Sequence, residues 1–242
     1  MENIFFQIDD LHTRINQNRL TPSLLAQIKE YYRIGLTYTS NALEGNTLTE
    51  SETKVVLEEG ITIGGKRLIE HLEAIGHSDA YTHLYELIKA NDITLDDINR
   101  LHYLFYYRID QENAGRYRKV KAYITGSQYP LPLPTLLQDL MDELPNQLGK
   151  WRKEYHPVHV AALLHKEFVF IHPYIDGNGR VARLLMNLFL LQEGYEIALI
   201  PPIMRSEYFR ALEKAHKDDS DFLLFIANMV REAQQDYLRL FI

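Results

Sequence analysis

Apolar residues recur at three- and four-residue steps along most of this chain, a spacing typical of amphipathic helices. Such stripes cover residues 4–15, 24–36, 69–88, 98–105 and 181–191. The connections between them are short, and no internal repeat or low-complexity tract separates them. The pattern therefore predicts an all-α fold in one domain.

Local signals mark where several of these helices begin, end or weaken. Thr49 followed by Glu52 is typical of a capping box, and Gly60 is a suitable stop for the short helix that it opens. Gly76 lies inside a long apolar stripe, so we expect a weak point there. Pro145 lies inside another predicted helix, which we expect it to break.

Helical periodicity fails between residues 115 and 134. Residues 120–124 alternate between apolar and polar, Thr-Gly-Ser at 125–127 is typical of a turn, and the proline-rich residues 129–134 are incompatible with a helix. We therefore predict a short β-hairpin in an otherwise helical protein.

Composition narrows the functional class. The chain has 242 residues, no cysteine and a net charge of −7, which disfavours disulfides, thiolate chemistry and non-specific nucleic-acid binding. Its N-terminus has no signal-like pattern and no apolar run is long enough to cross a membrane. We therefore expect a cytoplasmic enzyme that binds neither nucleic acid nor membrane.

Anion-binding groups are concentrated in residues 172–183, which read His-Pro-Tyr-Ile-Asp-Gly-Asn-Gly-Arg-Val-Ala-Arg. Gly-Asn-Gly at 177–179 comes just before a predicted helix, whose N-terminal N–H groups can bind an anion. Arg180 and Arg183 share one face of that helix and lean back over the loop. The run predicts a phosphate site, although Gly-Asn-Gly alone also suits a helix-capping turn.

The same run holds candidates for a metal ligand and a general base. Asp176 beside an anion site is unfavourable unless a cation such as Mg²⁺ is shared with the phosphate oxygens. His172 is the one group in the run whose unperturbed pKa suits a general base near neutral pH. These complementary roles within one loop favour phosphate chemistry over a purely structural loop.

The run resembles the signature of the Fic family, His-Pro-Phe-x-Asp/Glu-Gly-Asn-Gly-Arg-x-x-Arg, and departs from it only at Tyr174, which replaces Phe. Gly179 is similar to the nucleotidyl-transferring members, because the phosphotransferase branch has Lys there. The resemblance covers roughly residues 36–240. It implies a Fic-type helical bundle with a β-hairpin flap, and a protein adenylyltransferase that moves AMP from ATP, with Mg²⁺, to a Ser, Thr or Tyr hydroxyl.

The resemblance also implies a role for individual residues. His172 would be the catalytic base and Asp176 the Mg²⁺ ligand. The ATP-binding residues would be Gly177, Asn178, Gly179, Arg180, Arg183, Tyr123, Ile124, Thr125, Gly126, Tyr208 and His216. The hairpin would hold the protein target by strand addition, with an ordinary surface hairpin as the alternative. Related proteins often have Asn in place of His216.

A second motif precedes the first by more than a hundred residues. Residues 40–46, Ser-Asn-Ala-Leu-Glu-Gly-Asn, resemble the inhibitory motif of the family in its N-terminal version. Glu44 ends a predicted helix, where an acid is poorly placed for the helix dipole, and this suggests a distant cationic partner. By the resemblance, Ser40 and Glu44 are inhibitory, and Glu44 competes with the γ-phosphate of ATP for Arg183.

The expected organisation is one Fic domain over residues 1–242, with an N-terminal helical extension over about residues 1–35 and an inhibitory helix over about residues 36–46. The expected partners are ATP and a protein target held along the flap, whose identity the sequence does not give. Self-modification and a homodimer formed through the tyrosine-rich surface are compatible with the sequence.

Three other functions remain open. Glu44 could orient a water that removes AMP from a modified protein, as in a deAMPylase or a bifunctional enzyme. A metal-dependent phosphohydrolase would use His156, His159, His165 and His172, although no carboxylate-rich ligand set accompanies them. A catalytically silent binding module is disfavoured by the complete set of reactive groups in residues 172–183.

Overall fold

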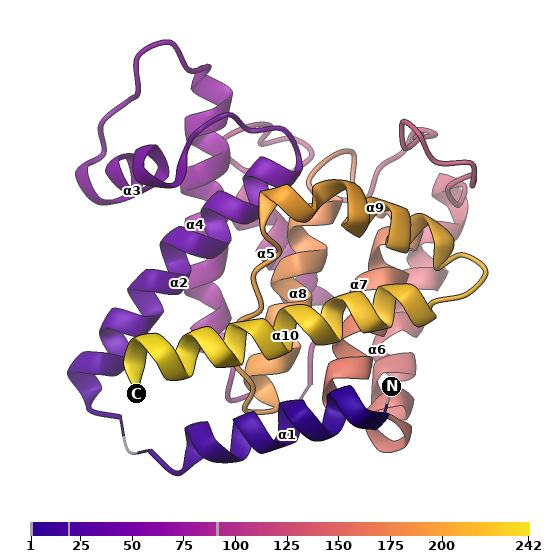
Figure 1. The fold of residues 1–242 in the computed structure, drawn as a ribbon. Coiled ribbons are helices and arrows are strands. Elements are labelled where there is room, and N and C mark those ends of the chain that lie inside the picture. Colours follow the sequence, from indigo (N-terminus) through magenta and orange to yellow (C-terminus); the bar gives the residue numbers. More distant parts are fainter. Residues whose placement is uncertain (1, 19, 91) are drawn as a thin grey trace.

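The computed structural model describes residues 2–18, 20–90 and 92–242. This part of the chain contains ten α-helices, two short 3₁₀ helices and no β-strand, which confirms the all-α fold class. Figure 1 shows how the helices are arranged. The helices are α1 (Glu2–Asn16), α2 (Pro22–Leu43), α3 (Glu50–Glu59), α4 (Leu68–Leu87), α5 (Leu95–Tyr106), η1 (Pro134–Leu136), α6 (Leu137–Glu154), α7 (Pro157–Ile171), α8 (Asn178–Gln192), η2 (Pro202–Met204), α9 (Arg205–Lys214) and α10 (Ser220–Phe241).

Helices α7 and α8 form the centre of the molecule. Almost every side chain of α8 is buried, because α7, α4, α5 and α2 all pack against it. Helices α6 and α10 cover α7 from other sides, and α1 lies along α10 (Figure 1). The loop that joins α7 to α8 is therefore fixed by the densest part of the core.

The N-terminal helix belongs to the same packed body. The apolar stripe of α1, predicted from its spacing, is buried at Ile4, Ile8, Leu11 and Ile15. One apolar cluster extends from Ile4 and Ile8 to α10, and a small second cluster lies under α3. None of the described helices combines the length and apolar character that crossing a membrane requires.

The predicted β-hairpin does not form. Residues 116–133 are irregular in the structure. Between Lys119 and Pro132 the described chain has a single backbone–backbone hydrogen bond. The N–H of Ser127 donates it to the carbonyl oxygen of Ile124 at 3.1 Å, which closes a turn. Prolines at every second position after Tyr129 remove N–H groups that a ladder needs, and an isolated hairpin is marginal in water. The turn was predicted correctly and the strands on either side of it were not.

The two residues expected to weaken or break a helix both lie inside continuous helices. Helix α4 continues through Gly76, whose missing side chain lets α4 approach α5, because a Cβ there would overlap the carbonyl oxygen of Phe105. Helix α6 continues through Pro145. The hydrogen bond lost at the proline is offset by the burial of the apolar side chains around it, such as Leu144 and Leu148.

We expect Gly76→Ala to lower the free energy of unfolding by about 3 kcal/mol, because the added methyl group forces the backbones of α4 and α5 apart. Urea unfolding followed by circular dichroism measures this change. The matched control is Gly149→Ala in α6, where no atom lies within 4 Å of the added Cβ, and there alanine should stabilise the protein by about 0.5–1 kcal/mol. Equal effects of the two substitutions would contradict the close-packing role of Gly76.

Candidate active site

The loop between α7 and α8 is shaped by backbone conformations that few residues tolerate. His172 ends α7 with φ 51°, and no other non-glycine residue of the described chain has a positive φ. Gly177 has φ 80° directly before α8. The side chain of Asn178 accepts a hydrogen bond from the N–H of Tyr174 and donates one to its carbonyl, both 2.9 Å. Asn178, predicted to bind ATP, thus holds the loop closed with its side chain.

Tyr174, the departure from the Fic signature, is held by α5. Its hydroxyl donates to Asn99 Oδ1 at 2.7 Å, and its ring stacks on His102 with 3.7 Å between ring centres. Burial lowers the pKa of His102 to about 4, so the ring is neutral. It accepts from Gly115 N–H and donates to the carbonyl of Asp176. Sequence reasoning missed His102, because it lies within the apolar stripe of a predicted helix.

His172 is arranged as a base. Its Nδ1 lies 3.3 Å from the carbonyl oxygen of Val169, which can only accept, so Nδ1 carries the proton and Nε2 keeps its lone pair. Burial lowers the pKa of His172 and the charge of Arg118 lowers it further, against opposing effects of the Val169 hydrogen bond and of Asp176. The imidazole is therefore neutral at pH 7 and able to take a proton.

Arg118 is a site residue to which sequence reasoning gave no role. It is buried, and it donates from Nε to the carbonyl of His172 at 2.9 Å. Its two terminal nitrogens donate to the carbonyls of Val120 and Pro132, 3.0 and 2.7 Å away. Arg118 therefore fastens both ends of the irregular segment to the backbone of the base. Its acceptors are backbone carbonyls far apart in sequence, which no sequence pattern marks.

Arg183 is fully buried and bound by the end of α2. Its Nη2 donates to Glu44 Oε1 at 2.8 Å and to the carbonyl of Ser40 at 2.9 Å, and its Nε donates to Ser40 Oγ at 3.0 Å. Its Nη1 donates to the hydroxyl of Tyr208 at 3.2 Å, which then donates to His165 Nε2 at 2.9 Å. The ion pair expected between Glu44 and Arg183 is present, and Ser40 binds the same guanidinium twice.

The carboxylate of Glu44 lies over the start of α8. A Cβ on Gly179 would overlap Glu44 Oε1, so Gly179 leaves the room in which this carboxylate sits. Burial raises the pKa of Glu44, but the charges of Arg183 and Arg180 and the hydrogen bond from Arg183 outweigh this effect and keep the pKa below its usual value. Glu44 is therefore ionised and placed where the sequence predicted a phosphate.

Arg180 is also engaged. It is buried and contacts Glu73 Oε1 at 2.8 Å and Asp176 Oδ1 at 3.1 Å. Glu73 in turn accepts from Asn46 of the second motif at 2.8 Å. Asp176 Oδ1 also accepts from the N–H of Gly177, whereas the other Asp176 oxygen has no hydrogen-bond partner in the described chain.

The four histidines proposed for a metal-dependent phosphohydrolase do not gather. His165 is bound to Tyr208, and His156 accepts from Val158 N–H and contacts Asp9 at 3.0 Å. Within residues 2–18, 20–90 and 92–242 no group of three or more His, Asp or Glu residues could hold a metal ion. The described structure therefore does not favour this alternative, because His165 and His156 bind polar groups of different helices and do not face one common centre.

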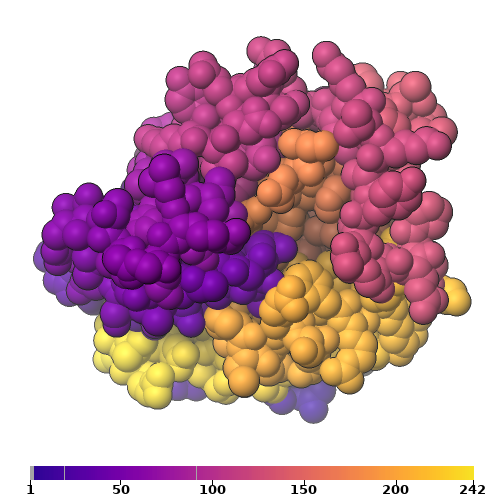
Figure 2. Space-filling model, turned by 90° about the horizontal axis from the view of Figure 1, so that it is seen from above, coloured from indigo at the N-terminus to yellow at the C-terminus, as the bar shows by residue number. Residues whose placement is uncertain are grey.

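A cavity of about 900 Å³ opens beside His172, and Figure 2 shows the hollow on this face of the molecule. Of the predicted ATP-binding residues, Ile124, Thr125, Gly126, Gly179, Tyr208 and His216 line it, together with His172 and Glu44. Tyr123 does not line it, and this residue is 85% exposed.

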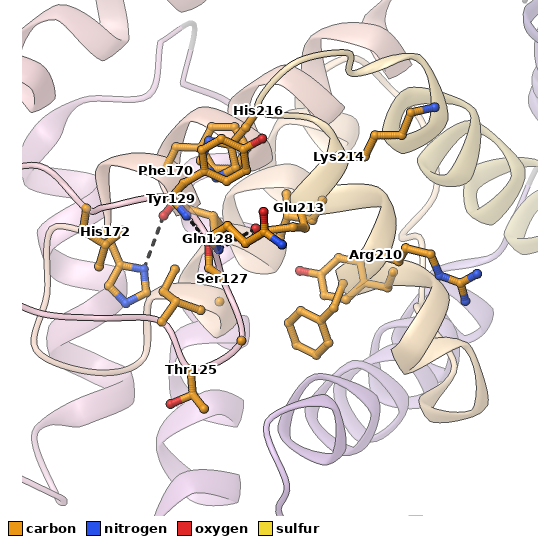
Figure 3. A pocket seen from close by; sticks show the side chains of 18 of the residues that line it. Thr125, Ser127, Gln128, Tyr129, Phe170, His172, Arg210, Glu213, Lys214 and His216 are labelled. Carbon is orange, nitrogen blue, oxygen red and sulfur yellow. Dashed lines mark hydrogen bonds between the residues drawn. The ribbon is translucent and has the colours of Figure 1, made fainter.

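The far end of the cavity is closed by the irregular segment and α9. His216 is stacked between Phe170 and Tyr129, with 3.6 and 3.9 Å between ring centres, and Figure 3 shows the three rings together. The N–H of Gln128 donates to Glu213 at 2.8 Å. His216 thus belongs to the wall of the cavity and holds the segment against it.

Comparison with known proteins gives the same result as the geometry. Residues 92–190 match the Fic/DOC family. A protein adenylyltransferase Fic from Drosophila willistoni is 37% identical over 205 residues, 83% of this chain and 41% of that protein. The chain therefore spans less than half the length of this curated relative.

Solved structures share the fold over almost the whole chain. A fragment of Fic-1 from C. elegans superposes with a TM-score of 0.88 at 29% identity, covering 98% of this chain and 72% of that one. A Fic-domain signalling protein from Bacteroides thetaiotaomicron has a TM-score of 0.86 at 26% identity, covering 95% of both chains. The matched region includes the loop from His172 to Arg183, which departs from the family signature only at Tyr174, and the chain belongs to the Fic/DOC family.

Proposed function

We propose that this chain is a protein adenylyltransferase, which moves AMP from ATP to a hydroxyl of a protein, and that Glu44 inhibits it at rest. One observation carries the proposal. The lone pair of a neutral His172 opens onto a nucleotide-sized cavity at the N-terminus of α8, and a carboxylate paired with Arg183 fills the phosphate end of that cavity.

The chain supplies the groups that hold a triphosphate. The N–H groups of Asn178 and Gly179, at the positive end of α8, can donate to phosphate oxygens, whereas the N–H of Gly177 already donates to Asp176. Arg183 meets the γ-phosphate once Glu44 withdraws, and it keeps its orientation because Ser40 and Tyr208 still bind it. Arg180 neutralises the β-phosphate region from its place between Glu73 and Asp176.

Asp176 fits a magnesium ion. Its unpaired oxygen belongs to a side chain that is 57% exposed, and Mg²⁺ in nucleotide sites is bound by one or two carboxylates and the substrate phosphates. When bound there, the ion would neutralise phosphate charge that otherwise opposes Asp176. Asp176 is thus the one protein ligand that we propose for the magnesium ion.

Transfer then needs one proton movement by the protein. The target hydroxyl gives its proton to His172 Nε2 as its oxygen bonds to the α-phosphorus, and the bond from that phosphorus to the bridging oxygen breaks to release pyrophosphate. Residues 119–126 are irregular, are not buried and make few backbone–backbone hydrogen bonds, so an extended target segment can pair with their backbone. Positioning and charge stabilisation supply most of the rate, as in other phosphoryl transfers.

We expect Arg118→Leu to lower kcat about tenfold or more, because it unfastens the target-binding segment and removes the positive charge beside His172. The charge of Arg118 lowers the pKa of His172, so its loss raises that pKa and moves the acid limb of the pH–rate profile to higher pH. Arg118→Lys keeps the charge and should keep the limb in place. A limb unmoved by Arg118→Leu would contradict the electrostatic part of this role.

The test of the proposed function is transfer from doubly labelled ATP. The chain and its Glu44→Gly variant are incubated with Mg²⁺ and ATP labelled either at the α- or at the γ-phosphate, with candidate protein targets. Incorporation of the α-label alone, with a mass increase matching AMP, supports adenylyl transfer. Incorporation of the γ-label would show phosphoryl transfer instead and overturn the proposal.

A further inference from the structure

We propose that the protein substrate presents an acidic segment next to its modified hydroxyl, and that this segment docks on a basic strip formed by Arg116, Lys119 and Lys121. The inference rests on the proposed function and names its substrate class. The strip belongs to the same irregular segment, residues 116–133, that lines the cavity with Ile124 and Thr125.

The charge of this segment is opposite to that of the chain. Residues 113–138 contain four Lys or Arg and no Asp or Glu, although the whole chain has 33 acidic and 26 basic residues. Arg118 is buried, whereas Arg116, Lys119 and Lys121 are exposed and make no ion pair within the described residues. Arg116 lines a shallow depression together with Asp96 and Glu112, and these two carboxylates offset part of its positive charge. Lys119 and Lys121 therefore supply most of the positive charge of the strip.

The strip begins beside the catalytic base. The N–H of Arg118 donates to the carbonyl of Pro173 at 2.8 Å, and its side chain reaches the carbonyl of His172. Lys119 follows directly, so a chain segment that lies along the strip passes His172. Val120 lies between the two lysines and Tyr123 follows them, and at 55% and 85% exposed they offer apolar contacts to the same segment.

The carboxylates nearest the base do not oppose an acidic partner strongly. Glu44 is paired with Arg183 and Asp176 with Arg180. Glu44 and Asp176 belong to other parts of the chain than the strip, so we expect the acidic residues of the target to flank its hydroxyl on the side of Lys119 and Lys121. Opposite charges of this kind speed encounter and fix the register of the bound segment.

The test compares two synthetic peptides with one central threonine, flanked either by aspartates or by lysines. In the Glu44→Gly background at low salt, we expect kcat/KM for AMP transfer to be about tenfold or more higher for the acidic peptide. The variant Lys119→Glu, Lys121→Glu should lose this preference. The matched control, Lys89→Glu with Lys153→Glu, reverses two exposed lysines that also make no ion pair in the described chain, and it should keep the preference.

Equal use of the two peptides, or a preference unchanged in the Lys119→Glu, Lys121→Glu variant, would overturn the inference. Transfer of AMP to the enzyme itself without transfer to the acidic peptide would also overturn it, while leaving the proposed function in place. Failure to transfer the α-label to any acceptor would overturn the proposed function, and the inference with it.

Discussion

Glu44→Gly should raise the rate of AMP transfer about 10- to 100-fold, because misplacing a reacting group by about 1 Å can cost on the order of a hundredfold. The carboxylate of Glu44 occupies the space above Gly179 and takes one of the hydrogen bonds that Arg183 can offer to a phosphate. Removing it leaves Arg183 oriented by Ser40 and Tyr208 and free to meet the triphosphate.

Initial rates of α-label incorporation measure this effect, and thermal shift gives an independent readout. ATP·Mg²⁺ should raise the melting temperature of the variant more than that of the wild type, since tighter binding stabilises the folded state more. Glu44→Gln removes the charge of Glu44 but keeps the volume of its side chain. Because the glutamine amide oxygen can still accept a hydrogen bond from Arg183, this variant should raise the transfer rate less than Glu44→Gly does. Glu59→Gly, at the exposed end of α3, is the matched control and should have no effect on transfer.

A flat or lower transfer rate in Glu44→Gly would show that Glu44 does not inhibit this enzyme. If the variant instead loses the ability to remove AMP from a modified protein, Glu44 acts on the water that hydrolyses the protein–AMP bond. The transfer assay starts from ATP and the removal assay from a protein that already carries AMP, so together they distinguish these roles directly.

His172→Ala should lower AMP transfer by about 10²- to 10⁴-fold, the range typical of a lost general base, while leaving nucleotide binding nearly unchanged. His172 lines the cavity, but the predicted phosphate contacts come from α8 and from the arginines. The experiment is best made in the Glu44→Gly background, where the rate is high enough to measure a large loss. His159→Ala, a half-buried histidine outside the cavity, is the control.

The pH profile provides the second readout for His172. Its pKa lies below the usual value of 6.5, so the neutral form that accepts a proton predominates at pH 7 and is lost as pH falls through this lowered pKa. Transfer should therefore be constant near neutral pH and decrease in the acid range. An acid limb retained in His172→Ala, or transfer close to the wild-type rate, would contradict the assignment.

The helices that position the site could be predicted because their information is local. The capping box at Thr49 and the glycine stop at Gly60 each depend on residues within one turn, and both are present. The break expected at Pro145 was wrong, and the weak point expected at Gly76 does not interrupt α4, for a common reason. Local propensity treats glycine and proline as defects, whereas packing between α4 and α5 requires the first and burial along α6 tolerates the second.

The predicted hairpin was wrong because the alternation of apolar and polar residues marks one possible strand but does not show that a second strand pairs with it. Without a partner that supplies N–H groups across from Val120 to Ile124, the segment is held by side chains instead, chiefly Arg118 and the contact of Gln128 with Glu213. Strand-like sequence without a partner leaves backbone groups exposed, which is a property suited to binding another chain.

The sequence by itself determined the helical class, the candidate loop at residues 172–183 and the pairing of Glu44 with Arg183, because periodicity is local and the two motifs resemble a known family. Only the tertiary structure decided that Asn178 closes its own loop, that Arg180 is held by Glu73, and that Arg118 joins the base to the irregular segment. These contacts link residues through backbone carbonyls and buried charges. Their partners are chosen by the packing of helices in space, which a linear pattern does not specify.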